Sequence, residues 1–123
     1  NCTGLAMDNV NYYATCGTNQ RLVSVDRTTG AVTLITDFGT LNTTVTSVHA
    51  DDADNDGVAD FLYFKGGTKE VYFVCDPTTA PYVGVLTTFG TTTSTSSYGL
   101  GFDRANNRLY AYDDGPRDIV VIQ

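Results

Sequence analysis

Repetition is clearest in the stretch Leu22-Val23-Ser24-Val25-Asp26-Arg27-Thr28-Thr29-Gly30, which leads into a second β-rich run and ends at Phe38-Gly39-Thr40. The same order returns in Tyr72-Phe73-Val74-Cys75-Asp76-Pro77-Thr78-Thr79, which ends at Phe89-Gly90-Thr91. Each copy has two runs rich in β-branched and aromatic residues, joined by a turn of Thr, Gly or Pro, which is typical of a β-hairpin. We therefore expect a chain built from repeated hairpins.

A second repeated piece, broadly of the pattern small, apolar, small, apolar, Asp, occurs three times. Its copies are Gly4-Leu5-Ala6-Met7-Asp8, Ser47-Val48-His49-Ala50-Asp51 and Gly99-Leu100-Gly101-Phe102-Asp103. A run that carries tyrosine follows each copy, at residues 12–14, 61–64 and 109–112. The unit is thus four strands that repeat every ~45 to 50 residues, a period typical of β-propeller blades.

The repeats divide the 123 residues into two full blades and most of a third. Blade one is expected at about 3–40, blade two at about 45–91 and blade three, which stops after its third strand, at about 98–123. A closed propeller needs about 4–8 blades. We therefore expect that copies of the chain self-associate or that other segments of a longer chain complete the ring. A β-trefoil, which also places three repeats in roughly this length, is the alternative fold.

Three of the expected strands are apolar without alternation, at residues 61–64, 71–75 and 119–122. A strand with one face in water would alternate apolar and polar side chains. These strands are therefore expected to be buried on both faces, as happens when each blade stacks between two others. The expected fold class is all-β, with four-stranded antiparallel blades in an incomplete ring.

A resemblance to a known group rests on the run Leu22–Thr33, on Gly99-Leu100-Gly101-Phe102-Asp103 and on Arg108-Leu109-Tyr110-Ala111-Tyr112. These residues resemble the degenerate repeats of secreted and cell-surface β-propellers, and the resemblance covers nearly the whole chain. It implies the propeller fold. It implies little about function, because propellers serve as binding platforms, adhesins and enzymes alike.

The sharpest chemical signal is the loop Asp52-Ala53-Asp54-Asn55-Asp56-Gly57-Val58-Ala59-Asp60. Acids at its first, third, fifth and ninth positions, with glycine at the sixth for a sharp turn, suit Ca²⁺, which takes about 6–8 oxygen ligands in proteins. We expect the carboxylates of Asp52, Asp54, Asp56 and Asp60 and the backbone carbonyl of Val58 to bind the ion. Mg²⁺ fits less well because it keeps its waters and demands a strict octahedron. The alternative is a solvated acidic loop that holds no metal.

The loop differs from an EF-hand, because its twelfth position is Tyr63 rather than glutamate and a strand rather than a helix is expected to follow it. It is similar to the nine-residue Asp-x-Asp-x-Asp-Gly-x-x-Asp loops of integrin-type FG-GAP propeller blades, which join the first two strands of a blade. Asp51 and Tyr63 are twelve positions apart, whereas Asp8 and Tyr13 are five apart. The calcium loop is thus an insertion in blade two, and at most one such site is expected per chain.

Two of the three cysteines flank the first expected hairpin, whose turn centres near Asn9. Residues that pair across this turn have numbers that sum to 18, which places Leu5 opposite Tyr13 and Cys2 opposite Cys16. Opposed residues of antiparallel strands lie about 4.5–5.5 Å apart at Cα, within disulfide range. A Cys2–Cys16 disulfide is expected to stabilise the fold by roughly 3 kcal/mol, and two free thiols are the alternative.

The remaining cysteine, Cys75, aligns with Val25 and is expected to be a buried small side chain, with an intermolecular disulfide as the alternative. One disulfide indicates an oxidising compartment, so we expect an extracellular or cell-surface protein. Asn1 and Asn42 lie in N-glycosylation sequons, which fits that location. The Thr- and Ser-rich tract at residues 91–97 is either a plain linker or an O-glycosylated one.

The charge balance narrows the range of partners. Only 17% of the residues are charged, and 14 acids against 7 bases give a net charge of -7. This balance argues against nucleic acid and against anionic membrane surfaces, because phosphate binding needs clustered Lys and Arg. No apolar run approaches the roughly 20 residues of a membrane helix, so no membrane insertion is expected. Extracellular protein or glycan remains as an expected external partner.

His49 is the only histidine, in a strand expected to line the propeller channel. With Asp8, Asp51 and Asp103 it defines an alternative function, a secreted lactonase- or lyase-like enzyme with a site at the channel mouth. The three aspartates recur in every blade, which favours turn capping over catalysis. We therefore expect no catalytic residues. The expected function is a non-enzymatic, extracellular, calcium-stabilised propeller module for structural assembly, adhesion or the binding of protein or glycan.

Overall fold

The computed structural model describes residues 2–16, 21–37, 45–66, 69–78, 83–92 and 97–122. All regular structure in these ranges is β, and none of the described residues lies in a helix. The strands are β1 (Cys2–Met7), β2 (Asn11–Cys16), β3 (Arg21–Asp26), β4 (Val32–Asp37), β5 (Val45–Asp51), β6 (Phe61–Gly66), β7 (Glu70–Cys75), β8 (Val83–Thr91), β9 (Ser97–Asp103), β10 (Arg108–Asp113) and β11 (Asp118–Val121).

The strands form three small antiparallel sheets, each from consecutive segments of the chain. Sheet 1 has the order β1-β2-β3-β4, sheet 2 the order β5-β6-β7-β8 and sheet 3 the order β11-β10-β9. The prediction of an all-β chain that groups its strands by four, four and three is confirmed. The described strands do not close into a barrel, and the closed β-trefoil that was the alternative is not what they show.

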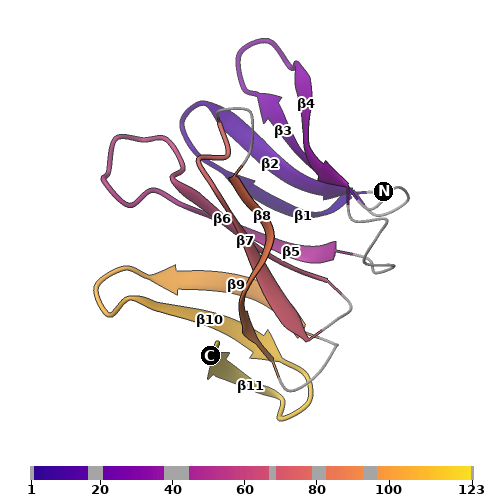
Figure 1. The fold of residues 1–123 in the computed structure, drawn as a ribbon, viewed down its shortest axis with the longest axis vertical. Helices are drawn as coiled ribbons and strands as arrows, with labels where there is room; N and C mark the ends of the chain where they lie inside the picture. Colours follow the sequence, from indigo (N-terminus) through magenta and orange to yellow (C-terminus); the bar gives the residue numbers. More distant parts are fainter. Residues whose placement is uncertain are drawn as a thin grey trace.

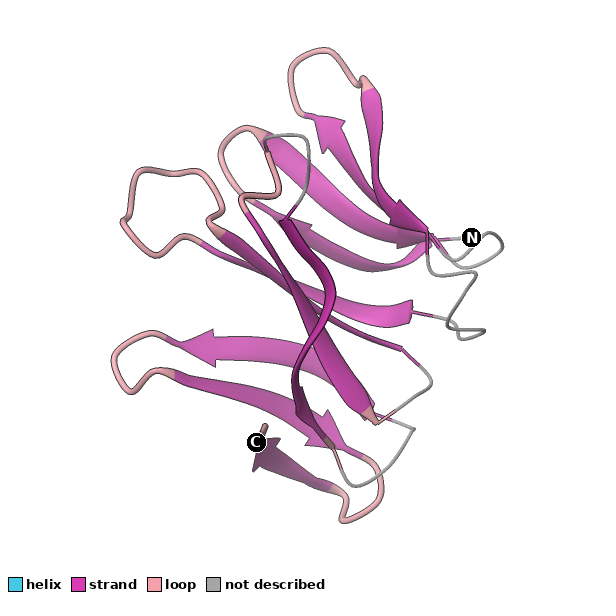
Figure 2. Ribbon diagram, viewed as in Figure 1, coloured by secondary structure: helices cyan, strands magenta, loops and turns pink. Residues whose placement is uncertain are grey.

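Sheet 2 lies between sheet 1 and sheet 3 (Figure 1). The first strands of the three sheets run through the middle of this stack, with β1 beside β5 and β5 beside β9. The turns that join the first two strands of each sheet lie along one side of the molecule, on the left of the view (Figure 2). These three turns carry the candidate site.

Two apolar clusters hold the stack together, one on each face of sheet 2. The first contains Tyr13, Leu22 and Ile35 of sheet 1 and faces Leu62 and Phe64 of sheet 2. The second joins the opposite face of sheet 2 to sheet 3, and its buried members are Tyr63, Val71, Leu109, Ala111 and Ile122. Full burial of each large side chain contributes about 1.5–3 kcal/mol. The prediction that residues 61–64 and 71–75 are buried on both faces is confirmed.

The matching prediction for residues 119–122 is wrong. Ile122 is 5% exposed and packs in the second cluster, but Ile119 is 68% exposed and Val121 is 38% exposed. Ile119 and Val121 belong to β11, which packs against sheet 2 through its other face, and no described sheet covers the outer face of sheet 3. The apolar side chains on one face of this strand are therefore exposed to solvent in the single chain.

A bulge shifts the register of the first hairpin. Cys2 lies opposite Cys16 as expected, and the two residues form a disulfide. Leu5 lies opposite Ala14 rather than Tyr13, because the register moves by one residue between Cys2 and Gly4. The predicted pairing is thus right at the disulfide and wrong along the rest of β1. A β-bulge adds one residue to one strand of the pair, which is the size of the shift.

Candidate metal centre and the turns around it

The acidic loop lies where the sequence places it, between β5 and β6, at residues 52–60. The carboxylate oxygens of Asp52, Asp54 and Asp60 lie within 4.8 Å of one another. The Asp54 side chain is exposed, and the other two are half-buried. Three converging carboxylates are the oxygen ligands that a hard divalent cation takes, and they neutralise it with charge to spare. The donor set therefore fits a hard divalent cation.

Backbone N–H groups of the loop hold these three carboxylates in place. Gly57 donates to Oδ2 of Asp52 at 2.7 Å, and Ala53 donates to Oδ2 of Asp60 at 2.7 Å. The N–H of Asp56 reaches Oδ1 of Asp54 at 3.1 Å. Short aspartate side chains often bind the backbone of their own turn in this way. The sequence thus folds the loop into a shape that aims its carboxylates at a common point.

Two of the five predicted ligands are not part of this group. The carboxylate of Asp56 accepts a 2.8 Å hydrogen bond from the N–H of Val58 at its Oδ1, and as a ligand it stays a prediction. The backbone carbonyl of Val58 stays a prediction as a ligand. The structure therefore brings together three of the four predicted carboxylates.

The neighbouring acids change the pKa of the Asp54 carboxyl. The N–H of Asp56 lowers the pKa of the Asp54 carboxyl, but desolvation and the charges of Asp56, Asp60 and Asp52 outweigh it, so the pKa is raised above its ordinary value. Desolvation and repulsion among the carboxylates therefore both make the charged form of Asp54 unfavourable. A bound cation relieves such repulsion.

The loop is anchored to sheet 1 rather than standing free in solvent. Asn9, in the β1–β2 turn, donates its N–H to the carbonyl of Gly57 at 2.8 Å. Gly57 has a φ of 92°, and a Cβ there would overlap the side-chain amide of Asn9. Glycine is therefore required at this position both for its backbone conformation and for the close approach of the neighbouring turn.

Asp8 completes the link between the two turns. Its Oδ2 accepts the hydroxyl of Tyr13 at 2.6 Å and the N–H of Ala59, inside the acidic loop, at 2.8 Å. Its Oδ1 accepts the N–H groups of Val10 and Asn11. Burial raises the pKa of Asp8, but these four hydrogen bonds together lower it below its ordinary value. Turn capping was expected of this residue, and the contact with the next sheet was not.

The equivalent aspartate of sheet 2 also reaches the following sheet. Asp51 is buried and forms an ion pair with Arg104 of the β9–β10 turn. Asp103, the third member of the set, accepts hydrogen bonds from the backbone and side chain of Asn106 in its own turn. The signal for these links was the recurrence of Asp at one place in each repeat.

His49 lies apart from the acidic loop. It is half-buried on β5, opposite Tyr63, and burial lowers its pKa. Among the described residues, the one group of three or more His, Cys, Asp or Glu side chains placed to share a metal ion is Asp52, Asp54 and Asp60. His49 is not a member of this group.

A pocket of about 300 Å³ opens between sheets 2 and 3, on the side of the three turns. It is mainly aromatic with two polar residues, and its lining is Phe61, Tyr63, Phe73, Phe102, Arg104 and Asn107. The ring of Tyr63 stacks on that of Phe102 with 5.4 Å between centroids, and the guanidinium of Arg104 lies over the Phe102 ring at 4.8 Å. The pocket therefore combines aromatic faces with hydrogen-bond donors.

Other predicted features have different outcomes. Cys75 is a free, half-buried thiol. Asn1, Asn42 and residues 93–96 of the Thr- and Ser-rich tract lie outside the described residues. The described part of the chain holds no helix long and apolar enough to cross a membrane.

Comparison of the sequence with models of known protein families and with curated proteins gives no match.

Proposed function

We propose that this chain is a non-enzymatic, calcium-stabilised module of β-propeller-type blades, which works outside the cell or at its surface in structural assembly, adhesion or the binding of protein or glycan. The observation that carries the proposal is the convergence of Asp52, Asp54 and Asp60 on a loop that is hydrogen-bonded to the neighbouring sheet. An ion held there would rigidify two sheets at once, because Asn9 and Asp8 bind the same loop.

The stacking of the sheets supports the propeller-type arrangement. Each sheet is antiparallel and built from consecutive strands, and the first strands lie next to one another. Radial stacking of four-stranded sheets around their first strands is how propeller blades are arranged. The Cys2–Cys16 disulfide supports an oxidising, extracellular location.

A non-enzymatic role is supported by what the recurrent aspartates do. Asp8 is engaged by four hydrogen-bond donors, and Asp51 is paired with Arg104. Both side chains are used to join neighbouring sheets.

A calcium ion bound by carboxylates adds stability by mass action, about 2.7 kcal/mol when free calcium is 100 times the dissociation constant.

The experiment is a pair of thermal melts of the wild type, one with calcium and one with chelator, repeated for Asp54→Asn. Calcium is expected to raise the wild-type midpoint and to raise the midpoint of the variant less, because the amide oxygen is an uncharged and weaker ligand than the carboxylate. In chelator the variant is expected to melt at the same temperature as the wild type or higher, because the raised pKa of Asp54 shows that its charge is unfavourable without an ion. Asn also keeps the oxygen that accepts the N–H of Asp56.

Asp114→Asn is the matched control, since Asp114 is exposed on the turn between β10 and β11, away from the loop. It removes the same charge and is expected to keep the full calcium response. Identical wild-type midpoints with calcium and chelator would remove calcium from the proposal. Calorimetric titration with Ca²⁺ and Mg²⁺ in separate runs then tests the choice of ion, with tighter binding of Ca²⁺ expected.

The aromatic pocket favours glycan among the binding roles. Sugar rings present C–H faces that pack on aromatic rings and hydroxyls that accept from Arg104 and Asn107. Ligand-observed NMR with a panel of mono- and disaccharides tests this role. Asn107→Gly is the variant of choice, because Asn107 has a φ of 53° that glycine also adopts. Saturation transfer to a sugar is expected in the wild type and weaker in the variant, and no transfer to any sugar would contradict the glycan role.

A further inference from the structure

The three sheets present equivalent tyrosines on the same face of their second strands. Ala6 lies opposite Tyr13, His49 opposite Tyr63, and Gly101 opposite Tyr110. Tyr13 is buried against sheet 2, and Tyr63 is buried against sheet 3. Tyr110 is only half-buried and lines an open hollow. The outer face of sheet 3 is thus the face that sheets 1 and 2 each use to receive the following sheet.

The outer face of sheet 1 exposes apolar side chains at the positions that sheets 2 and 3 pack against the preceding sheet. Val48 packs toward sheet 1, and Leu100 packs toward sheet 2, so both face the preceding sheet. The repeat places Leu5 at the equivalent position, where it is 69% exposed. Met7, on the same face, is 55% exposed. Sheet 1 therefore exposes the face that sheets 2 and 3 turn toward their predecessors.

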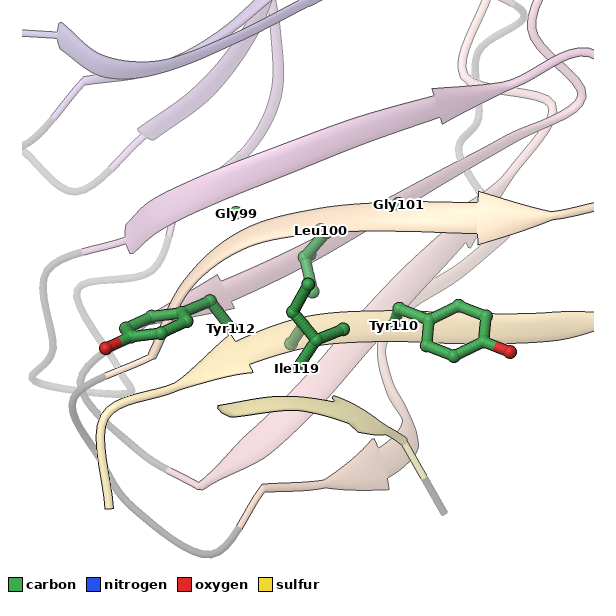
Figure 3. A pocket seen from close by; sticks show the side chains of 7 residues that line it. Gly99, Leu100, Gly101, Tyr110, Tyr112 and Ile119 are labelled. Atoms are coloured by element: carbon green, nitrogen blue, oxygen red, sulfur yellow. The ribbon is translucent and has the colours of Figure 1, made fainter. Parts of the chain in front are cut away.

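The hollow on sheet 3 has room for a projecting apolar side chain. Its volume is about 250 Å³, and Figure 3 shows Tyr110 and Tyr112 at its two ends with Ile119 between them. A Cβ added at Gly99 or Gly101 would meet no atom within 4 Å, so the floor of the hollow is open. Its lining is Gly99, Leu100, Gly101, Tyr110, Ala111, Tyr112 and Ile119, without a charged residue.

We propose that a second copy of this chain covers sheet 3, and that it does so with the outer face of its sheet 1. The contact continues the internal stacking from one chain to the next, with Leu5 of one copy over the hollow of the other. Phe102 stacks on Tyr63 between sheets 2 and 3, and the repeat gives Met7 the position of Phe102 and Tyr110 that of Tyr63. Met7 of the second copy therefore lies over Tyr110.

The contact is head-to-tail, because it joins two different faces. Two copies that each cover the other form a closed ring of six sheets, within the range of about 4–8 blades that propellers use. This inference rests on the proposed function, since it names the partner for its structural assembly role. It also explains why apolar side chains stay exposed at both ends of the stack, where water would otherwise cover them.

The test is the mass in solution of the wild type and of two charge variants, by light scattering in calcium. The wild type is expected at twice the 13.2 kDa of one chain. Tyr110→Glu places a charge on the contact face of sheet 3, and Leu5→Glu places one on the contact face of sheet 1. Each variant alone is therefore expected at the mass of one chain. Thr28→Glu adds the same charge on the exposed β3–β4 turn and is expected to stay dimeric.

The mass of a mixture of the two variants tests whether the contact joins sheet 1 of one copy to sheet 3 of the other. The Tyr110→Glu chain keeps an intact sheet 1, and the Leu5→Glu chain keeps an intact sheet 3, so the mixture is expected to form a dimer with one of each. A mixture that stays monomeric overturns the proposal. A Leu5→Glu chain that still dimerises alone also overturns it, because the contact would then join two identical faces. A wild type that stays monomeric overturns the proposal as well.

Folding of each variant is checked by its thermal melt. If Leu5→Glu or Tyr110→Glu does not melt cooperatively, Met7→Glu and Tyr112→Glu replace them on the same two faces, with the same expected masses. The calcium melts separate this inference from the proposed function. A monomer that calcium stabilises overturns the contact alone, and a dimer without a calcium response overturns the metal site alone.

Discussion

The carboxylate of Asp8, at the end of β1, accepts a 2.8 Å hydrogen bond from the N–H of Ala59, which lies 51 residues later in the acidic loop. The same oxygen accepts the hydroxyl of Tyr13 at 2.6 Å. One side chain therefore orients a buried tyrosine and holds the acidic loop of the neighbouring sheet. Asp51 repeats the relationship one sheet further on, through Arg104.

Asp8→Asn is expected to destabilise the fold by about 1–3 kcal/mol, because an amide offers one acceptor oxygen where the carboxylate offers two. Either the pair of turn N–H groups or the pair formed by Tyr13 and Ala59 then loses its acceptor. Urea unfolding followed by circular dichroism measures the loss. Asp114→Asn, on an exposed turn, is the control and is expected to stay within about 0.5 kcal/mol of the wild type.

Gly57→Ala is expected to cost more than Gly30→Ala in the same unfolding measurement. Both glycines have positive φ, 92° and 75°, so alanine is strained at either place by about 1–2 kcal/mol. Only at position 57 does the added methyl group also overlap Asn9, while nothing lies within 4 Å at position 30. Adding Asn9→Ala to Gly57→Ala relieves that overlap. Equal losses for the two single variants would contradict the close packing of the two turns.

The strand order could be predicted from the sequence because it follows from local repetition. The hairpins around Gly30 and Pro77 and the insertion at residues 52–60 each leave a mark in a short window of residues. The bulge after Cys2 could not be predicted from a short window of sequence, because a register shift by one residue depends on how the two strands pair and pack. The predicted register of Leu5 failed for that reason.

The candidate site was predicted in outline and missed in its connections. Acid spacing indicated the loop, but the contact of Ala59 with Asp8 depends on how two sheets stack, which spacing along one loop does not encode. The same holds for Asp51 and Arg104, which are 53 residues apart. Asp56 has the spacing of a ligand and lies outside the group of three, and its Oδ1 accepts the N–H of Val58; as a ligand it stays a prediction.

Arg104→Met is expected to destabilise the fold by about 1–3 kcal/mol, because it leaves the buried carboxylate of Asp51 without its cation. Methionine keeps much of the apolar stem of the side chain but loses the guanidinium that lies over the Phe102 ring, which adds to the expected loss. Arg21→Met is the matched control. Arg21 and Asp37 lie 3.9 Å apart with side chains 48% and 52% exposed, and exposed pairs contribute about 0–1 kcal/mol. A loss for Arg104→Met no larger than that for Arg21→Met would contradict a stabilising role for the pair of Arg104 and Asp51.

Stability is expected to fall between about pH 7 and pH 5 because of His49. Burial lowers its pKa below the ordinary value of 6.5, so the unfolded chain takes up a proton as the pH falls through 6.5 while the folded chain resists it. The unfolded state then binds more protons, and stability drops as the pH falls. Asp8 has its lowered pKa in an acidic range, so its contribution is lost below about pH 4 and does not overlap. Urea midpoints measured across this range test the assignment: His49→Gln is expected to flatten the slope between pH 7 and pH 5 and to leave the acidic loss in place. A variant with the wild-type slope would assign that slope to another group.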